Sequence, residues 1–186
     1  MTAPELYEQR ISSILRELGI PATYGAERGM ILHPEAEDLM PVGKDMFGRE
    51  QRLTPAAAAA WNAMRAGAAK EGVELLLVSG FRSVDYQRGI WDRKLAAGQT
   101  VDRILTVSAP PGYSEHHTGR ALDLTALGCE PLTESFEHLP AFAWLAQNAG
   151  RFGFLMSYPR NNPHGVVYEP WHWCFTDQTT TLNWTS

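Results

Sequence analysis

Two short stretches of the chain carry side chains that commonly bind metal ions and move protons. The first, 114–123, reads Ser-Glu-His-His-Thr-Gly-Arg-Ala-Leu-Asp, and the second, 169–172, reads Glu-Pro-Trp-His. Two nitrogen ligands and one oxygen ligand, from His116, Asp123 and His172, would leave the fourth position of a tetrahedral zinc ion open for water. The pattern predicts a hydrolytic zinc site, divided between two segments and holding one ion.

The combination of residues, more than any one of them, favours a metal. A single histidine or aspartate is usually an ordinary polar residue. Asp123, however, lies between Leu122 and Leu124 in an apolar stretch, where a carboxylate is costly to bury unless a cation or a donor satisfies it. A turn at Gly119 would allow His116 and Asp123 to reach the same ion, because glycine tolerates the backbone conformations of a tight turn.

Glu169 is the candidate catalytic base. Pro170 lies between it and His172 and prevents a regular helix across the pair, so this is not the helical His-Glu-x-x-His arrangement. The chemistry still needs the same parts. Zinc lowers the pKa of bound water, and a nearby carboxylate takes the proton and returns it to the departing amine.

The other histidines are weaker candidates. Adjacent residues of an extended chain point to opposite sides, so His117 is not expected to bind the same ion as His116. His33 has no other ligand type near it in the sequence and is expected on a loop or at the surface. Surface or loop positions are also expected for Glu115, His138 and His164.

Hydrophobic periodicity and capping residues predict the elements that hold these segments. Helices are expected over 5–18, over 55–70, from Ser83 to a stop at Gly98, and over 140–149. Strands are expected over 73–78, 120–124, 152–158 and 171–175. The segment 20–52 reads as irregular, with at most one short strand, and a polar connection follows Gly98. Helices and strands are interspersed, which predicts an α+β fold with a mainly antiparallel central sheet flanked by helices.

Composition excludes several classes of protein. With 186 residues, of which 44% are apolar and 20% charged, the chain is long enough for one domain with a well-buried core. The net charge of −5 argues against a nucleic-acid partner. No apolar stretch reaches the roughly 18 residues of a membrane span. Because no signal segment is visible either, a soluble cytoplasmic protein is expected, with a monomer favoured.

Cys129 and Cys174 are the only cysteines. Their spacing is that of neither a zinc ribbon nor a disulfide framework, so free thiols are expected. A single bridge between them is the alternative in an oxidising compartment.

Three blocks of the sequence resemble one family. The pattern Ser-x-His-x-x-Gly-x-Ala-x-Asp of 114–123, the Glu-Pro-Trp-His of 169–172, and the Ser-Gly-Phe-Arg-Ser of 79–83 with Gln87 are similar to those of the zinc D-alanyl-D-alanine carboxypeptidases. This group of D,D- and L,D-carboxypeptidases and D,D-dipeptidases is related to lysostaphin-type peptidases and the hedgehog signalling domain. The resemblance covers about 40–176, and it implies a hedgehog/D,D-peptidase-like fold.

The resemblance also implies roles for individual residues. Zinc would be bound by the three residues named above, with Glu169 as catalytic base and acid. Arg82 would hold the substrate and stabilise the developing oxyanion. Ser114 and Gln87 would contact the terminal carboxylate or the neighbouring peptide, although a loop hydroxyl and a solvated helix glutamine remain the alternatives. Trp171 and Trp173 are expected in the core and the cleft wall.

Two positions depart from the family pattern. Relatives often carry an arginine just before the Tyr-Pro pair and another soon after the Glu-Pro-Trp-His block, where this chain has Ser157 and Cys174. This difference is expected to alter the preference of the pocket for the far end of the substrate. The zinc ligands themselves are complete, so activity is expected.

The implied activity is removal of a terminal D-amino acid from a peptidoglycan stem peptide or muropeptide. A D,D-dipeptidase or a crosslink endopeptidase with the same site is the enzymatic alternative. A non-catalytic peptidoglycan-binding module that keeps zinc for structure is the alternative of another class. The chain is expected to divide into an N-terminal helix and wrapping segment (1–39), a catalytic core (40–176) and a tail (177–186). Action in the periplasm or outside the cell would require trimming or lysis.

Overall fold

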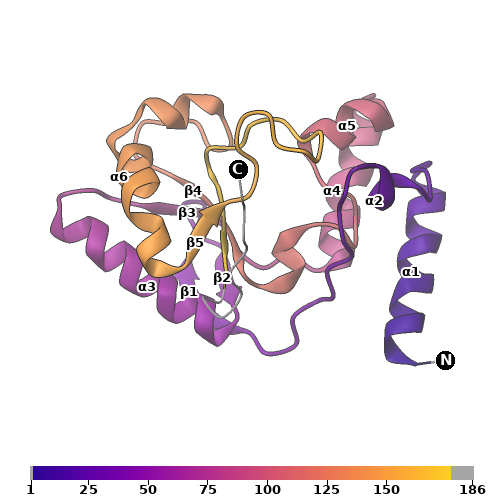
Figure 1. Ribbon diagram of the computed structural model, residues 1–186, viewed down its shortest axis with the longest axis horizontal. Coiled ribbons are helices and arrows are strands. Elements are labelled where there is room, and N and C mark those ends of the chain that lie inside the picture. The colour runs from indigo at the N-terminus through magenta and orange to yellow at the C-terminus, as the bar shows by residue number, and fades with distance from the viewer. Residues whose placement is uncertain (1, 177–186) are drawn as a thin grey trace.

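A four-stranded sheet forms the centre of the molecule in the computed structural model, which describes residues 2–176 (Figure 1). Its strand order is β3-β4-β6-β5, and every neighbouring pair is antiparallel. The strands are β3 (Leu76–Ser79), β4 (Ala121–Thr125), β5 (Phe154–Met156) and β6 (His172–Phe175). The predicted α+β fold with an antiparallel central sheet is confirmed.

Helices α3 (Pro55–Lys70) and α6 (Pro140–Asn148) pack against the sheet through the larger of two hydrophobic clusters. Proline at the first helical position starts each helix, where its missing N–H costs nothing. Trp61 and Met64 of α3 are fully buried in this cluster, together with Leu122 and Leu124 of β4. This cluster supports the strands that carry the second and third candidate ligands.

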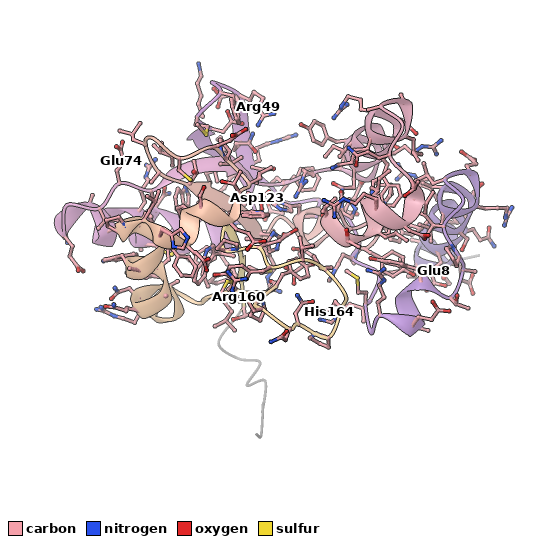
Figure 2. All side chains as sticks on the ribbon, turned by 90° about the horizontal axis from the view of Figure 1, so that it is seen from above. Glu8, Arg49, Glu74, Asp123, Arg160 and His164 are labelled. Atoms are coloured by element: carbon pink, nitrogen blue, oxygen red, sulfur yellow. The ribbon has the colours of Figure 1, made fainter. Side chains whose placement is uncertain are left out.

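A second hydrophobic cluster joins four other helices, α1 (Ala3–Glu17), α2 (Tyr24–Glu27), α4 (Val84–Ala96) and α5 (Val101–Val107). Figure 1 shows these helices on the opposite side of the molecule from α3 and α6. In the view from above, Asp123 lies between Glu74 and Glu8, which are toward opposite ends of the molecule (Figure 2). The N-terminal segment therefore shares its core with the helices that follow β3.

The segment 20–52 is more regular than predicted. It contains α2 and a two-stranded antiparallel sheet of β1 (Met40–Lys44) and β2 (Glu50–Leu53). The Asp45 carboxylate stabilises the turn between the strands by accepting hydrogen bonds from the backbone N–H groups of Phe47 and Arg49. The expectation of one strand at most was wrong, because β1 is mostly exposed and lacks the alternation of a half-buried strand.

The predicted helices agree with the structure to within two or three residues at their ends. Ser83 caps α4 as expected, since its side chain accepts a hydrogen bond from the Tyr86 N–H group. The expected strand at 73–78 begins later, at Leu76. Helix α5 lies in the expected polar connection. It begins after the Thr100 cap, and its buried residues are Ile104 and Leu105.

Three further expectations concern the whole chain. Within residues 2–176, no helix combines the length and the apolar character that crossing a membrane requires. Cys129 and Cys174 are both free thiols, as expected. The division at 39 and 176 stays a prediction, and the predicted tail lies outside the described residues.

Candidate metal centre and substrate cleft

Strand pairing places Asp123 beside His172. The two residues are direct partners in the antiparallel pair β4·β6, so their side chains leave the same face of the sheet. Successive side chains of a strand alternate between faces, and Leu122 and Leu124 point into the hydrophobic core. Asp123 therefore points away from the core, towards a cleft, although it is only 3% exposed.

His116 reaches the same point from a short 3-10 helix, η1 (Glu115–Thr118), which ends at Gly119. Gly119 adopts a φ of 64°, and a Cβ atom there would lie 2.7 Å from Leu39 Cδ2, so the predicted turn needs glycine. Nδ1 of His116 lies 2.6 Å from the Gly80 carbonyl oxygen. A carbonyl only accepts, so Nδ1 carries the proton and Nε2 offers its lone pair.

The Gly80 carbonyl is itself held in place by the β1–β2 hairpin. The Gly80 N–H group donates to Gln51 Oε1 over 2.8 Å, and Gln51 Nε2 donates to Asp45 Oδ2 over 2.8 Å. A carboxylate in the hairpin turn is thus linked through an amide and a peptide unit to the His116 ring. The hairpin that the sequence did not indicate has a direct structural connection to the site.

Both nitrogens of the His172 ring meet carboxylates. Nδ1 lies 3.1 Å from Asp123 Oδ1, and Nε2 lies 2.7 Å from Glu115 Oε2. Burial alone lowers the pKa of His172, but hydrogen bonds to the two carboxylates outweigh it and raise the pKa to about 10. Burial also lowers the pKa of His116, to about 4, so that ring is neutral.

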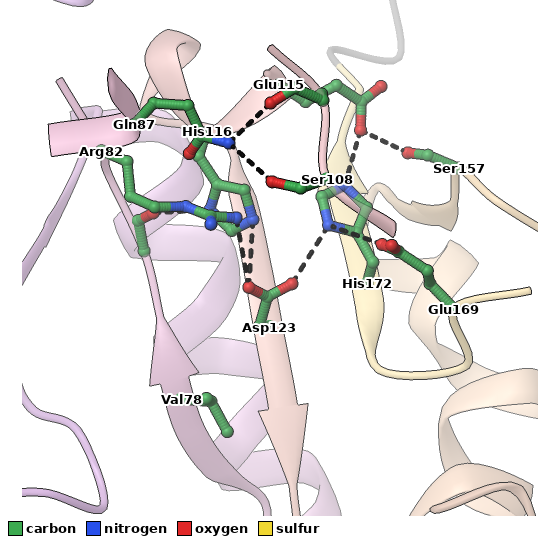
Figure 3. Close-up of polar contacts among 12 residues, drawn as sticks. Val78, Arg82, Gln87, Ser108, Glu115, His116, Asp123, Ser157, Glu169 and His172 are labelled. Carbon is green, nitrogen blue, oxygen red and sulfur yellow. Dashed lines mark hydrogen bonds and ion pairs between the residues drawn. The ribbon is translucent and has the colours of Figure 1, made fainter. Parts of the chain in front are cut away.

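These three side chains fit a metal ion. One ligand atom from each of His116, Asp123 and His172 lies within 4.8 Å of the other two, and all three residues are buried (Figure 3). His116 Nε2 is buried without a hydrogen-bond partner in the described part of the chain, although Asp123 Oδ2 lies 3.2 Å away. Burial raises the pKa of Asp123, but the two histidines outweigh this effect and hold it well below its ordinary value. Two nitrogens and a carboxylate oxygen match a catalytic zinc site.

Glu169 lies beside this group without belonging to it. Its Oε2 is 3.9 Å from His172 Nδ1, and the side chain lines the cleft. Burial raises the pKa of Glu169 to about 7, the range in which a general base can both accept and release a proton near neutral pH. The predicted role of Glu169 as a base beside a metal stays a prediction.

The cleft has a volume of about 240 Å³ and contains the other predicted contacts. Arg82 donates to Asp123 Oδ2 over 3.3 Å, and Gln87 donates to Ser108 Oγ and to the Ala109 carbonyl. Among the described residues, Arg82 Nε and Gln87 Oε1 are buried without a hydrogen-bond partner. Gln87 is only 1% exposed, so the expected alternative of a solvated helix glutamine does not hold. Buried unpaired groups of this kind are available to a ligand.

Ser114 and Lys94 complete the polar lining. Ser114 is 3% exposed and faces the cleft immediately before η1. Lys94 lies two turns beyond Gln87 on α4 and is half-buried. It forms no ion pair within the described part of the chain. Sequence reasoning did not single out Lys94.

His117 and Glu115 were both assigned outside the site. Both His117 nitrogens are engaged, Nδ1 with the Arg82 carbonyl at 2.6 Å and Nε2 as acceptor of the Gly112 N–H at 3.0 Å. His117 thus serves the framework, in agreement with its exclusion as a ligand. The surface or loop position expected for Glu115 was wrong, because its carboxylate contacts His172. Its place between Ser114 and His116 was the only available signal.

Ser157 lies next to Glu115, away from the cleft lining. Its Oγ donates to Glu115 Oε2 over 2.6 Å, and Cys174 also interacts with the Glu115 carboxylate. Neither side chain is among those that line the cleft. The two departures from the family pattern therefore bear on the surroundings of His172, whereas an effect on the far end of the substrate stays a prediction.

Comparisons with known proteins identify a family and several relatives. Residues 50–178 match the VanY family, described as D-alanyl-D-alanine carboxypeptidase. A D-alanyl-D-alanine carboxypeptidase of Enterococcus faecalis is 32% identical over 178 residues, which cover 89% of this chain and 59% of the relative. The chain spans about half the length of the curated relatives it matches, 43% and 59% for two of them.

Two solved structures have the same fold. The L,D-carboxypeptidase LdcB is 35% identical with a TM-score of 0.68, over 76% of this chain and 69% of that one. A Glu-to-Ala mutant of the vancomycin-resistance D,D-pentapeptidase VanY, in complex with Zn(II), is 27% identical with a TM-score of 0.60, over 81% of this chain and 88% of that one.

Proposed function

Because the chain belongs to the VanY family of D-alanyl-D-alanine carboxypeptidases, we propose that it is a zinc-dependent carboxypeptidase. Its substrates would be peptidoglycan stem peptides or their soluble fragments, from which it removes the terminal D-alanine. The observation that carries this proposal is the convergence of His116, Asp123 and His172 beside Glu169 in one cleft. Two nitrogens, one carboxylate and an adjacent base are the parts of a zinc peptidase.

A zinc ion held by these three residues would supply a Lewis acid and a water of lowered pKa. Glu169 takes the proton from the attacking water and passes it to the amine nitrogen as the carbon–nitrogen bond breaks. The Arg82 guanidinium stabilises the negative charge that develops on the scissile carbonyl oxygen. Arg82 is close enough for this role, since it already lies 3.3 Å from the Asp123 carboxylate.

The polar and apolar walls of the cleft suit a short peptide that ends in D-alanine. Gln87 Oε1 accepts a peptide N–H, and the Ser114 hydroxyl donates to a carbonyl or carboxylate oxygen. The remaining lining is largely apolar, with Val107, Leu132, Val166 and Val167. Such a wall accommodates the methyl side chains of a D-alanine terminus.

The test is product analysis with the zinc-loaded protein. Mass spectrometry would follow four substrates: the free D-Ala-D-Ala dipeptide, a stem tetrapeptide, a stem pentapeptide and a crosslinked muropeptide. We expect release of one terminal D-alanine from a stem peptide, and loss of this activity on chelation. Release from the dipeptide alone, or cleavage of the crosslink alone, would identify a dipeptidase or an endopeptidase instead.

Glu169→Ala separates the base from the metal ligands. Because the Glu169 carboxylate lies outside the three-residue ligand group, the variant should retain zinc while losing turnover. Metal analysis of the purified variant provides the control. Full turnover by Glu169→Ala would show that the assigned base is wrong, and muropeptide binding without any product would favour a non-catalytic binding module.

A further inference from the structure

We propose that Glu115 is a positioning residue that sets the tautomer and the orientation of the His172 ring, so that Nδ1 faces the metal position. This inference rests on the proposed zinc function. It assigns a role to a residue that is neither one of the three candidate metal ligands nor the candidate base. It also accounts for the contact between Glu115 and Ser157.

The hydrogen-bonding capacity of Glu115 decides the tautomer. An ionised carboxylate only accepts, so the 2.7 Å contact between Glu115 Oε2 and His172 Nε2 places a proton on Nε2. The other ring nitrogen, Nδ1, faces Asp123 Oδ1 at 3.1 Å. When a metal takes the Nδ1 lone pair, the proton on Nε2 stays on the Glu115 side.

Ser157 fixes the position of the carboxylate. Its Oγ donates to Oε2 of Glu115 over 2.6 Å, the same oxygen that accepts from His172 (Figure 3). Ser157 follows β5, Glu115 opens η1 and His172 opens β6, so the contact ties three separate segments together. One oxygen that accepts two short hydrogen bonds from different directions has little freedom to move.

Packing restrains the ring itself. The Tyr158 ring lies 5.0 Å from the His172 ring, centroid to centroid, at an interplanar angle of 45°. The His116 ring lies 5.0 Å away on another side, at 73°. Rotation of the His172 ring would therefore break the Glu115 hydrogen bond and disturb both ring contacts. The Glu115 hydrogen bond orients the His172 ring, and the two aromatic neighbours restrict its movement.

This arrangement predicts an effect on zinc affinity. Partners of metal-bound histidines typically contribute about 10–100-fold to metal affinity or activity. Glu115→Ala removes the acceptor and should weaken zinc binding by about that factor. Glu115→Gln keeps an oxygen acceptor but loses the charge, so its zinc affinity should lie between those of the wild type and Glu115→Ala. Ser157→Ala loses one hydrogen bond to the Glu115 carboxylate and leaves the His172 contact in place, so it should weaken zinc binding by about 2–10-fold.

The experiment measures zinc dissociation constants by competition with a chromophoric chelator for the full chain and each variant. A double variant, Glu115→Ala with Ser157→Ala, should bind zinc no more weakly than Glu115→Ala alone, because Ser157 acts through Glu115. Glu137→Gln is the matched control, since Glu137 pairs with Arg160 at the surface. Circular dichroism verifies that each variant is folded.

A second readout examines the ring directly. In nitrogen-15 NMR spectra of the zinc-loaded protein, we expect His172 to carry its proton on Nε2 and the metal on Nδ1, with loss of this signature in Glu115→Ala. A zinc affinity of Glu115→Ala within twofold of the wild type, or a metal bound to Nε2, would overturn the role of Glu115 and leave the proposed function standing. A wild-type protein that binds no zinc would overturn both the role of Glu115 and the proposed function.

Discussion

Replacing Glu169 with glutamine should abolish turnover and stabilise the zinc-free protein above neutral pH. Glu169 is 9% exposed, and burial raises its pKa from the ordinary value of 4.5 to about 7. The folded protein therefore holds this proton more tightly than the unfolded chain does. Between these two pKa values, stability falls as the pH rises, and above about pH 7 the full cost of the buried charge is present.

The size of the effect follows from the difference between the two pKa values. Each pH unit of displacement corresponds to about 1.4 kcal/mol, so the buried carboxylate costs the zinc-free protein about 3 kcal/mol at pH 8. Glutamine has nearly the same shape and remains neutral at every pH. The gain of Glu169→Gln should therefore be close to zero at pH 4 and rise to about 3 kcal/mol at pH 8.

The assay is urea denaturation of the chelator-treated wild type and variant at pH 4, 6 and 8. Zinc loading should reduce the gain at pH 8, because a nearby cation favours the ionised carboxylate of the wild type. Hydrolysis of a stem peptide by the zinc-loaded variant, measured in parallel, should be undetectable. The same substitution would thus increase stability and remove activity.

Glu74→Gln is the control, since Glu74 is exposed and lies away from the cleft. Its effect on the free energy of unfolding should be small, because the side chain is exposed. A gain for Glu169→Gln that is the same at pH 4 and pH 8, or no gain at pH 8, would show that Glu169 is not held at an elevated pKa.

Three other substitutions test other parts of the structure. Arg82→Lys keeps a positive charge but loses the planar donor fork, so kcat should fall by roughly 10²-fold with little change in KM, as steady-state kinetics would show. Gly119→Ala forces a side chain into a φ of 64° and towards Leu39, and should lower the free energy of unfolding by about 1–3 kcal/mol in thermal denaturation; unchanged stability would contradict the assigned turn. Lys94 lines the cleft and forms no ion pair among the described residues, so its charge is available to a second carboxylate on the substrate. Lys94→Met should therefore lower kcat/KM by about 2–10-fold for peptides with such a carboxylate and leave the matched carboxamide peptide unaffected, whereas an equal loss on both peptides would contradict this pairing.

Hydrophobic periodicity and capping residues were sufficient to predict most helices and strands of this protein. Helices α1, α3, α4 and α6 were predicted because each has an apolar face at helical spacing and a recognisable first residue. All four strands of the central sheet were predicted as strands, with errors of a few residues at their ends. Helix α5 and the β1–β2 hairpin were missed because one is short and the other is mostly exposed.

The candidate ligands could be proposed from sequence because each lies inside a compact motif. An aspartate between two leucines requires a partner for its charge, and the motif contains histidines at a suitable distance. Sequence reasoning separated His116 from His117 by the alternation of an extended chain. In the structure the two lie on a 3-10 helix, and the hydrogen bonds of His117 to Arg82 and Gly112 account for its different role.

Residue types and their spacing were enough to propose the side chains that could do the chemistry and most of the helices and strands that carry them. The neighbours that direct those side chains could be identified only in the folded molecule. Glu115 meets His172 across 57 residues of chain, and the Asp45 turn reaches His116 through Gln51 and Gly80. Such contacts depend on strand register and on the path of each loop. Hydrophobic periodicity reports which face of an element is buried, and it contains no information about which distant polar group a buried side chain will meet.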